Sequence, residues 1–193
     1  RCSFIKGDFM AIPEGDGSFD AAFAVEATCH APDRAKCYGE IRRVLKPGGL
    51  FAAYEWVLTD RYDGSAEHDR IRDGIEKGNG LPRLKPDADG LESLEAAGFD
   101  VVEKEDRALS SHPDFPWYLP LSGRGYGPRE LLMKPAGRWM THHLVGMLEQ
   151  IKLVPEGSQK VSGLLNDAAI WLVKGGETGI FTPMYFFLAR ARA

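Results

Sequence analysis

Cysteine is scarce in this sequence of 193 residues, which contains only Cys2, Cys29 and Cys37. The number is odd and no pair forms a C-x-x-C motif, so neither a disulfide framework nor a structural zinc site is expected. We therefore predict that the chain holds no metal and that it works in a reducing, intracellular compartment.

Long apolar runs and an excess of positive charge are also absent. The longest apolar candidate, residues 180–189, is about half the roughly 18 residues that a membrane-spanning helix needs. The net charge is −4 and the pI about 5.8, which argues against a nucleic-acid partner. No signal peptide is visible, but the chain begins with Arg1 rather than Met, and we expect it to be part of a longer protein.

Two common nucleotide-binding motifs are missing. No G-x-G-x-x-G follows an early strand, and the sequence has no P-loop. The pair Gly48-Gly49 ends a predicted helix rather than opening one. The usual phosphate or amino-acid cradle of a Rossmann fold is therefore not expected in this segment.

What is present is the composition of a globular protein, with 44% hydrophobic and 27% charged residues. Short apolar runs alternate with helical patterns over the first hundred residues, which indicates a doubly wound α/β fold with a parallel sheet. The predicted strands are Cys2–Lys6, Phe19–Val25, Leu50–Tyr54 and Phe99–Glu103, and the predicted helices are Asp33–Leu45 and Asp89–Ala97.

The ends of these helices carry recognisable signals. Residues 46–49 (Lys-Pro-Gly-Gly) are expected to stop the first helix. Asp89 and Glu92 have capping-box spacing at the start of the second, and Gly98 is a natural residue to follow its end. Between the third strand and this helix, residues 59–86 form a looser segment.

The pattern changes after Arg107. A proline-rich loop, residues 112–120, precedes two amphipathic helices around residues 140–151 and 161–172, with Gly175-Gly176 ending the second. The apolar stripes of these helices favour core packing, although they could instead wall an apolar substrate tunnel. We predict a sheet domain over residues 1–107, a helical insertion over residues 108–178, and a last strand within residues 179–193.

Three acidic residues fall at the predicted carboxyl ends of strands, namely Asp8, Glu26 and Glu55. Open parallel sheets bind ligands at this edge, and carboxylates gathered there would need ligand hydroxyls, amines or cations. The alternative is that strand ends are polar because they meet solvent.

Two further groups of side chains are candidates for the site. The loop after the second strand brings His30 and Cys29 close to Glu26. We interpret Cys29 as a small buried residue and leave His30 open between a functional and a structural role. Aromatic rings that could line an apolar pocket, stabilise a cation or form ordinary core are Tyr54, Trp56, Trp117 and Tyr118.

These residues carry a family resemblance. The run from Leu45 to Gly49 after an amphipathic helix, followed by a strand, is similar to the signature of class I S-adenosylmethionine (SAM)-dependent methyltransferases. Longer runs resemble the sterol 24-C-methyltransferases, from Cys2 to about Ala191. These runs are residues 26–32 (EATCHAP), 54–56 (YEW), 116–118 (PWY), 155–158 (PEGS) and 181–184 (FTPM).

The resemblance implies a partial Rossmann-like sheet, strands three to seven of the class I fold, with a helical C-terminal insertion that holds a sterol. SAM would be the cofactor, contacted by Asp8, Phe9 and Glu26. Methyl transfer to the side-chain double bond would create a carbocation, followed by a hydride shift and loss of a proton. Glu26, His30 and Glu55 would be catalytic, with Glu26 or His30 as the base, and the four aromatic residues would contact the sterol.

The chain departs from that family because it lacks the aromatic-rich acidic motif and the glycine-rich SAM motif. We therefore expect that Cys2–Lys6 is unpaired and that the segment alone is inactive. Two other readings remain open, a methyltransferase of another small lipid or metabolite and a non-catalytic lipid-binding module. A sterol substrate further implies peripheral association with a lipid-rich membrane, such as the cytoplasmic face of the endoplasmic reticulum, and a homo-oligomer is possible.

Overall fold

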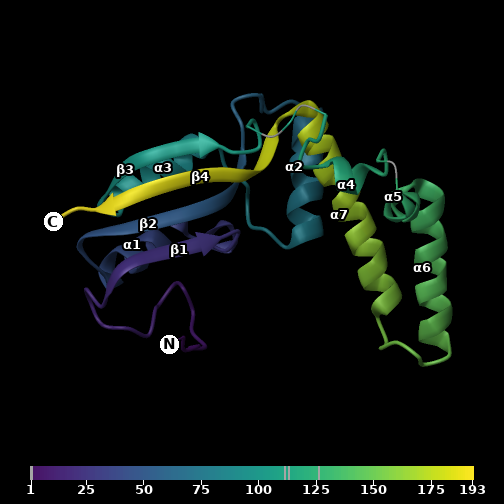
Figure 1. The fold of residues 1–193 in the computed structure, drawn as a ribbon, viewed down its shortest axis with the longest axis horizontal. Helices are drawn as coiled ribbons and strands as arrows, with labels where there is room; N and C mark the ends of the chain where they lie inside the picture. Colours follow the sequence, from purple (N-terminus) through teal and green to yellow (C-terminus); the bar gives the residue numbers. More distant parts are fainter. Residues whose placement is uncertain (1, 111, 113, 126) are drawn as a thin grey trace. The chain divides into compact units, whose positions relative to one another are not determined.

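The computed structural model describes residues 2–110, 112, 114–125 and 127–193 (Figure 1). The chain divides into two compact units. The first, the sheet unit, comprises residues 1–59, 82–110 and 182–193. The second, the helical unit, comprises residues 60–81 and 111–181, so it includes a segment that lies far upstream of the predicted insertion.

Four strands form the sheet in the order β1-β2-β4-β3. They are β1 (Phe19–Val25), β2 (Leu45–Leu58), β3 (Phe99–Asp106) and β4 (Phe181–Ala191). β1 pairs with β2 in parallel, whereas β3 and β4 are antiparallel. The α/β class is confirmed, but the sheet is mixed rather than wholly parallel. The arrowhead of β4 in Figure 1 points opposite to those of β1 and β3.

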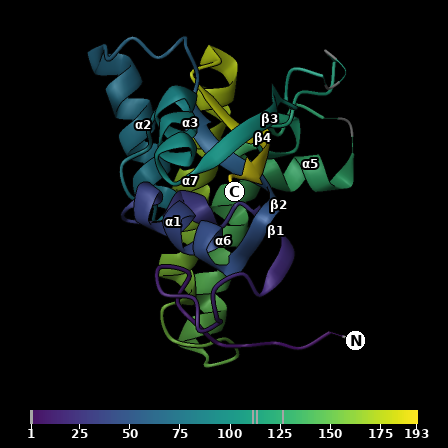
Figure 2. The ribbon, with the colours of Figure 1, turned by 90° about the vertical axis from the view of Figure 1, so that its left-hand side faces the viewer.

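One face of the sheet forms the core of its unit. The helices α1 (Arg34–Val44) and α3 (Asp87–Ala96) lie on this face (Figure 2). Phe51 of β2 is fully buried, and its ring centroid lies 5.8 Å from that of Tyr38, 5.8 Å from that of Phe99 and 5.3 Å from that of Phe187. Such edge and tilted contacts between aromatic rings stabilise a core beyond the area they bury.

The opposite face of the sheet is apolar and open to solvent at β1. Phe23 is 83% exposed and Val25 is 61% exposed. Both residues follow the alternation of a strand that is buried on one side only, since their neighbours Ala22 and Ala24 pack against the core. The tilted ring pair Tyr54–Phe186, with centroids 5.4 Å apart, comes from β2 and β4.

The element boundaries differ from the sequence predictions in three places. β1 has the predicted bounds, and α1 starts as predicted at its N-cap Asp33, whose side chain accepts the Lys36 N–H at 3.0 Å. However, β2 begins directly at Leu45, so the segment expected to be a break is part of the strand, with Gly48 at φ +77°. Leu50–Tyr54 is only the middle of this longer strand.

The other two differences concern α3 and the N-terminal segment. α3 is preceded by Pro86 as its N-cap, so the predicted capping box at Asp89 is wrong, whereas Gly98 follows the helix with φ +92° as predicted. Cys2–Lys6 is exposed and forms no strand, so the predicted strand is wrong and the expectation that this segment is unpaired is confirmed.

The helical unit contains α2 (Ala66–Asn79), α4 (Leu119–Ser122), α5 (Pro128–Met133), α6 (Pro135–Gln150) and α7 (Ser158–Thr178). α2 was not predicted. A Cβ added at Gly78 of α2 would lie 2.7 Å from the Cβ of Ala168 in α7, so a glycine is required at this close approach. α7 runs through Gly175 and Gly176 and ends instead at Gly179, which has φ +73°.

The apolar stripe of α6 does not form core, contrary to the favoured interpretation. Met140, Leu144, Met147 and Ile151 are each more than half exposed. On α7 only Ala168 and Ala169 of the predicted stripe are buried. Within the helical unit, α6 and α7 lie side by side (Figure 1). The exposed apolar side chains of both helices remain on the surface.

Candidate functional site

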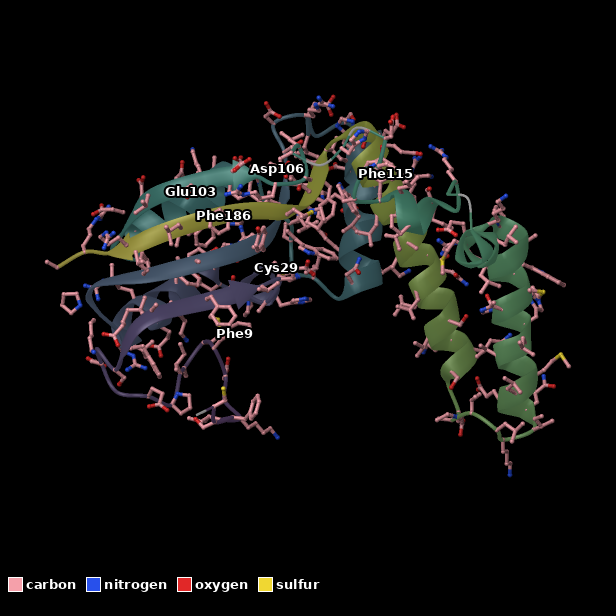
Figure 3. The ribbon with its side chains drawn as sticks, viewed as in Figure 1. Phe9, Cys29, Glu103, Asp106, Phe115 and Phe186 are labelled. Carbon is pink, nitrogen blue, oxygen red and sulfur yellow. The ribbon has the colours of Figure 1, made fainter. Side chains whose placement is uncertain are left out.

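Asp8 and Phe9 lie in a turn at the start of the sheet unit, where Asp8 and Ala11 form an isolated bridge. Oδ1 of Asp8 accepts the Met10 N–H at 2.8 Å. The two residues line a cavity of about 410 Å³ together with Ile5, Gly7 and Phe19 among others. Figure 3 shows the Phe9 ring beside β1. A carboxylate next to an exposed aromatic ring suits a flat ligand ring that carries an amino group.

Glu26 follows β1 directly and has φ +51°, a left-handed conformation that is uncommon for residues other than glycine. Its N–H donates to the carbonyl of Tyr54 at 3.0 Å, which extends the parallel pairing of β1 with β2 by one residue. The Glu26 side chain is exposed. Backbone strain held in place by pairing is a feature that clusters at functional sites.

Glu55 lies inside β2, where it shares the buried face with Phe51, Ala53 and Val57. It is 2% exposed. Oε1 accepts a hydrogen bond from the Thr28 hydroxyl and one from the Tyr38 hydroxyl at 3.3 Å, while Oε2 has no hydrogen-bond partner among the described residues. The prediction that Glu55 stands at the carboxyl end of a strand is therefore wrong.

Burial raises the pKa of Glu55, because desolvation disfavours the charged form, while the charge of Arg34 and the Thr28 hydroxyl act in the opposite direction. Burial of the two thiols themselves, and next the charge of Glu55, raise the pKa of Cys29 and of Cys37 to about 12. Both thiols are therefore neutral near pH 7 and unsuited to act as nucleophiles, in agreement with the structural interpretation of Cys29.

The loop after β1 brings Glu26 and His30 close to each other in the chain. Thr28 and His30 belong to a short 3-10 helix, η1 (Thr28–His30), in which Thr28 is buried and His30 exposed. The hydrogen bond from Thr28 to Glu55 ties this helix to β2. Figure 3 shows Cys29 of the same helix at the end of the sheet where the arrowhead of β1 lies. Glu55 thus contacts the loop after β1 through its hydrogen bond with the Thr28 hydroxyl.

The predicted acidic rim is not one site. Asp8 lines the cavity of about 410 Å³, which neither Glu26 nor Glu55 lines, whereas Glu26 is on the surface and Glu55 is in the interior. The reason is the length of β2, which places Glu55 within the strand rather than after it.

The predicted aromatic residues are divided between the two units. Tyr54 and Trp56 are half-buried side chains of β2 in the sheet unit. Trp117 lies in the helical unit, where its ring centroid is 5.8 Å from that of Phe181. The Tyr118 ring packs on α7, since a Cβ added at Gly176 would lie 2.1 Å from it.

A larger cavity lies within the helical unit, where the apolar stripes of two helices were expected to form core or, alternatively, the walls of a substrate tunnel. It has a volume of about 540 Å³ and is lined by residues of α4, α5, α6 and α7. Arg138 of α6 is among them. A cation placed between apolar positions of an amphipathic helix is the signal in the sequence that could have indicated it.

No group of three or more His, Cys, Asp or Glu side chains in the described part of the chain could hold a metal ion. No helix of residues 2–110, 112, 114–125 and 127–193 has the length and apolar character needed to cross a bilayer.

Two family models match the chain. Residues 1–53 match a methyltransferase domain, and residues 129–191 match the sterol methyltransferase C-terminal family. A cycloartenol-C-24-methyltransferase of Arabidopsis thaliana is 51% identical over 98% of this chain and 56% of its own length. A sterol 24-C-methyltransferase of Yarrowia lipolytica is 45% identical over 98% of this chain and 52% of its own. The chain spans about half the length of these curated relatives.

Solved structures share the fold at low sequence identity. A putative sarcosine dimethylglycine methyltransferase from Galdieria sulphuraria matches with a TM-score of 0.61 and 19% identity over 96% of this chain and 58% of that one. The geranyl diphosphate C-methyltransferase from Streptomyces coelicolor, solved with S-adenosyl-L-homocysteine, matches with a TM-score of 0.57 and 14% identity over 97% and 52%.

The chain therefore has the fold of the class I SAM-dependent methyltransferases, with β1 to β4 and α1 and α3 forming part of the sheet domain. Within that class, its sequence resembles the sterol 24-C-methyltransferases over nearly its whole length. This agrees with the motifs identified in the sequence.

Proposed function

We propose that the protein carrying this chain transfers a methyl group from SAM to the side-chain double bond of a sterol. The observation that carries the proposal is the identity of 42–51% over nearly the whole chain to relatives named as sterol or cycloartenol C-24-methyltransferases. This similarity extends over both the sheet unit and the helical unit. It therefore supports a sheet unit that binds SAM and a helical unit that contacts the sterol.

The residues present fit one end of the cofactor. SAM supplies an activated methyl group on a positively charged sulfur. One oxygen of Asp8 is engaged by the Met10 N–H, which leaves the other to accept a hydrogen bond from the adenine amino group. The Phe9 ring, 36% exposed in the cavity of about 410 Å³, offers a flat apolar surface to the same ring system.

Glu26 and His30 are the groups placed to handle the charge and proton of the reaction. Methylation of an alkene leaves a carbocation, and a carboxylate near it is stabilising where water is excluded. Loss of the final proton requires a base within hydrogen-bond reach. Glu26 and His30 are both exposed and both lie on the loop after β1. The kcat values of the Glu26→Gln and His30→Gln variants decide which of the two is the base.

Glu55 has a different proposed role because it is buried and bonded to Thr28. We assign it the role of a positioning residue that holds the 3-10 helix carrying His30, rather than a group that touches substrate. Tyr54 and Trp56, half-buried in β2, are proposed to present their ring faces to the cationic centre. Trp117 and Tyr118 are proposed to contact the sterol.

The exposed apolar side chains of α6 support a further part of the proposal, peripheral association with a sterol-containing membrane such as the cytoplasmic face of the endoplasmic reticulum. We also keep the prediction that the 193 residues alone neither bind SAM well nor turn over. Homo-oligomer formation stays a prediction.

The proposal is tested with the full-length protein, SAM labelled in its methyl group and a panel of sterols with and without a side-chain double bond. We expect label only in sterols that contain the double bond, with the new carbon on the side chain by mass spectrometry. Asp8→Asn should raise the KM for SAM about tenfold, because the hydrogen bond to a charged acceptor is replaced by a weaker one to a neutral acceptor, while the KM for sterol stays unchanged.

Two outcomes would overturn the proposal. Methylation of a non-sterol lipid or metabolite, with none of any sterol, would favour the other methyltransferase reading. Sterol binding without measurable SAM binding would favour a non-catalytic lipid-binding module.

A further inference from the structure

Polar side chains face each other between α6 and α7, although both helices are amphipathic. Arg138 and His142 are four residues apart on α6 and so share one face of that helix. Nη1 of Arg138 donates to Oδ1 of Asn166 at 3.2 Å, and Nδ1 of His142 lies 3.4 Å from the Ser162 hydroxyl, both partners being on α7. Met140, two residues after Arg138, lies about 200° further around the helix. The apolar stripe of α6 therefore points away from α7.

The hydrogen bonds of Arg138 leave several donors unused. Its guanidinium also donates to the carbonyls of Leu121 at 2.6 Å and of Met133 at 2.8 Å, which occupies three of its five N–H groups. Since a guanidinium only donates, the atom of Asn166 that it contacts must be the amide oxygen. The amide nitrogen of Asn166 then carries two further N–H groups, which have no acceptor among the described residues. Two neighbouring side chains thus hold four unused donors.

Arg138 and Asn166 line the cavity of about 540 Å³ in the helical unit. On α7, Asn166 is followed at helical spacing by Ile170 and Val173, which lie on the same face and are apolar. Other apolar residues of the lining are Leu121, Met133, Pro135 and Trp139. Besides Arg138, the polar residues of the lining are Ser122, His142, Asn166, Asp167, Lys174 and Glu177. The cavity is therefore amphiphilic, and its volume falls in the range of sites that bind small molecules.

The acidic residues of the cavity leave the positive charge of Arg138 unbalanced. Glu177 forms an ion pair with Arg124 at 2.6 Å, and Asp167 is exposed. Lys174 adds a second positive charge to the lining. Desolvation alone shifts the pKa of Arg138, downward, so no carboxylate of the described part of the chain acts on it. A partly buried guanidinium without a counter-charge is stabilised by an anion that accepts its hydrogen bonds.

We propose that this cavity binds an amphiphile with a carboxylate or phosphate head and an apolar chain, the head accepting hydrogen bonds from Arg138 and Asn166. A charged acceptor matches unused donors beside an unbalanced cation, since hydrogen bonds between charged groups are about twice as strong as neutral ones. The chain covers the apolar walls. Neither Trp117 nor Tyr118, the residues proposed to contact the sterol, is among the described residues of the lining. The cavity thus takes a second ligand, whatever the methyl acceptor is.

The first test compares a charged head with a neutral one. The fluorescent fatty acid cis-parinaric acid and its methyl ester are titrated separately into the full-length protein at neutral pH. We expect the ester to bind at least about tenfold more weakly, because it keeps the chain but lacks the charge. Equal affinities for the acid and the ester would overturn the proposal.

The second test replaces the donors of Asn166 by a carboxylate of nearly the same shape. Asn166→Asp can still accept the hydrogen bond from Arg138, so urea unfolding should show no loss of stability. We expect this variant to bind the acid at least about tenfold more weakly and the ester within about twofold of the wild type. Gln150→Glu is the matched control, because it adds the same charge at an exposed position of α6 outside the cavity.

Gln150→Glu should leave both affinities within about twofold. Equal effects of the two substitutions on the acid, or an equal loss of acid and ester binding in Asn166→Asp, would contradict the assigned roles of Arg138 and Asn166.

The third test identifies the head and the need for a chain by competition with cis-parinaric acid. Palmitic acid should compete more strongly than octanoic acid, because a longer chain covers more of the apolar wall. Lysophosphatidic acid is compared with palmitic acid, and the stronger competitor shows whether the head is a phosphate or a carboxylate. Inorganic phosphate that competes as well as either lipid, or equal competition by the two fatty acids, would overturn an amphiphilic ligand.

Discussion

Replacing Thr28 by valine tests how the buried Glu55 carboxyl is held. Valine has nearly the shape of threonine but cannot donate, so Oε1 would keep only the 3.3 Å bond from Tyr38, while Oε2 already has no hydrogen-bond partner among the described residues. Loss of a donor to a neutral buried acceptor costs about 1 kcal/mol, and loss of a donor to a charged one about 2–3 kcal/mol. We expect Thr28→Val to lower the free energy of unfolding by the smaller amount in acid and by the larger amount at higher pH.

The direction of this pH dependence follows from the pKa of Glu55. Burial raises that pKa above its ordinary value of 4.5, so the folded state holds the proton more tightly than the unfolded state. The stabilisation is complete below about pH 4.5 and is lost as the pH rises through the folded-state pKa. Removing the Thr28 donor raises the pKa further, so the variant and the wild type diverge as the pH rises.

The measurement is urea unfolding of the full-length protein, followed by tryptophan fluorescence at about pH 5 and about pH 8. Thr28→Ser is the matched control because it keeps the hydroxyl, and it should lose only the contribution of one methyl group, about 1 kcal/mol, at both pH values. Glu55→Gln, which cannot ionise, should gain stability relative to the wild type as the pH rises. Equal losses for valine at both pH values, or no relative gain for glutamine, would refute the reasoning.

Three further predictions concern packing and catalysis. Gly78→Ala should lower the free energy of unfolding by about 1–3 kcal/mol, since its Cβ would lie 2.7 Å from a side-chain atom of α7. Gly39→Ala is the control, because an added Cβ there has nothing within 4 Å, and it should raise the free energy of unfolding by up to about 1 kcal/mol. Urea unfolding measures both variants. Phe51→Ala should lower the free energy of unfolding by about 3–5 kcal/mol, because it empties the aromatic centre of the core, and a loss below about 1 kcal/mol in the same assay would contradict that packing. Of Glu26→Gln and His30→Gln, the substitution that removes the base should lower kcat by about 10²–10⁴-fold and abolish the acidic limb of the pH profile, because a base acts only when it is deprotonated. A normal kcat in both variants would exclude both residues as the base.

The sequence-based prediction worked best where local patterns and tertiary packing agree. β1 has the predicted bounds, because its alternating side chains suit a strand with one buried face. α2 was missed because Gly74 and Gly78 lower the helical propensity of that segment. Both glycines allow α2 to pack closely on α7, since Gly74 lies against Trp171 and Gly78 against Ala168.

The site was harder to predict than the fold. Glu55 was expected at a ligand-binding edge because the predicted strand Leu50–Tyr54 ends directly before it. The partners that make the interior position tolerable, Thr28 and Tyr38, are 27 and 17 residues away in the sequence. Similarly, Arg138 depends on carbonyls of Leu121 and Met133 that no helical pattern reveals.

The open face of β1 has a consequence for handling the protein. β1 is an edge of the sheet, and its exposed residues include Phe23 and Val25, while its one acidic residue, Asp20, is occupied by an ion pair with Lys46 at 2.7 Å. An uncharged apolar edge strand is a template for strand-to-strand aggregation. Self-association of these 193 residues when produced alone should therefore begin at β1, and a lysine in place of Phe23 should suppress it.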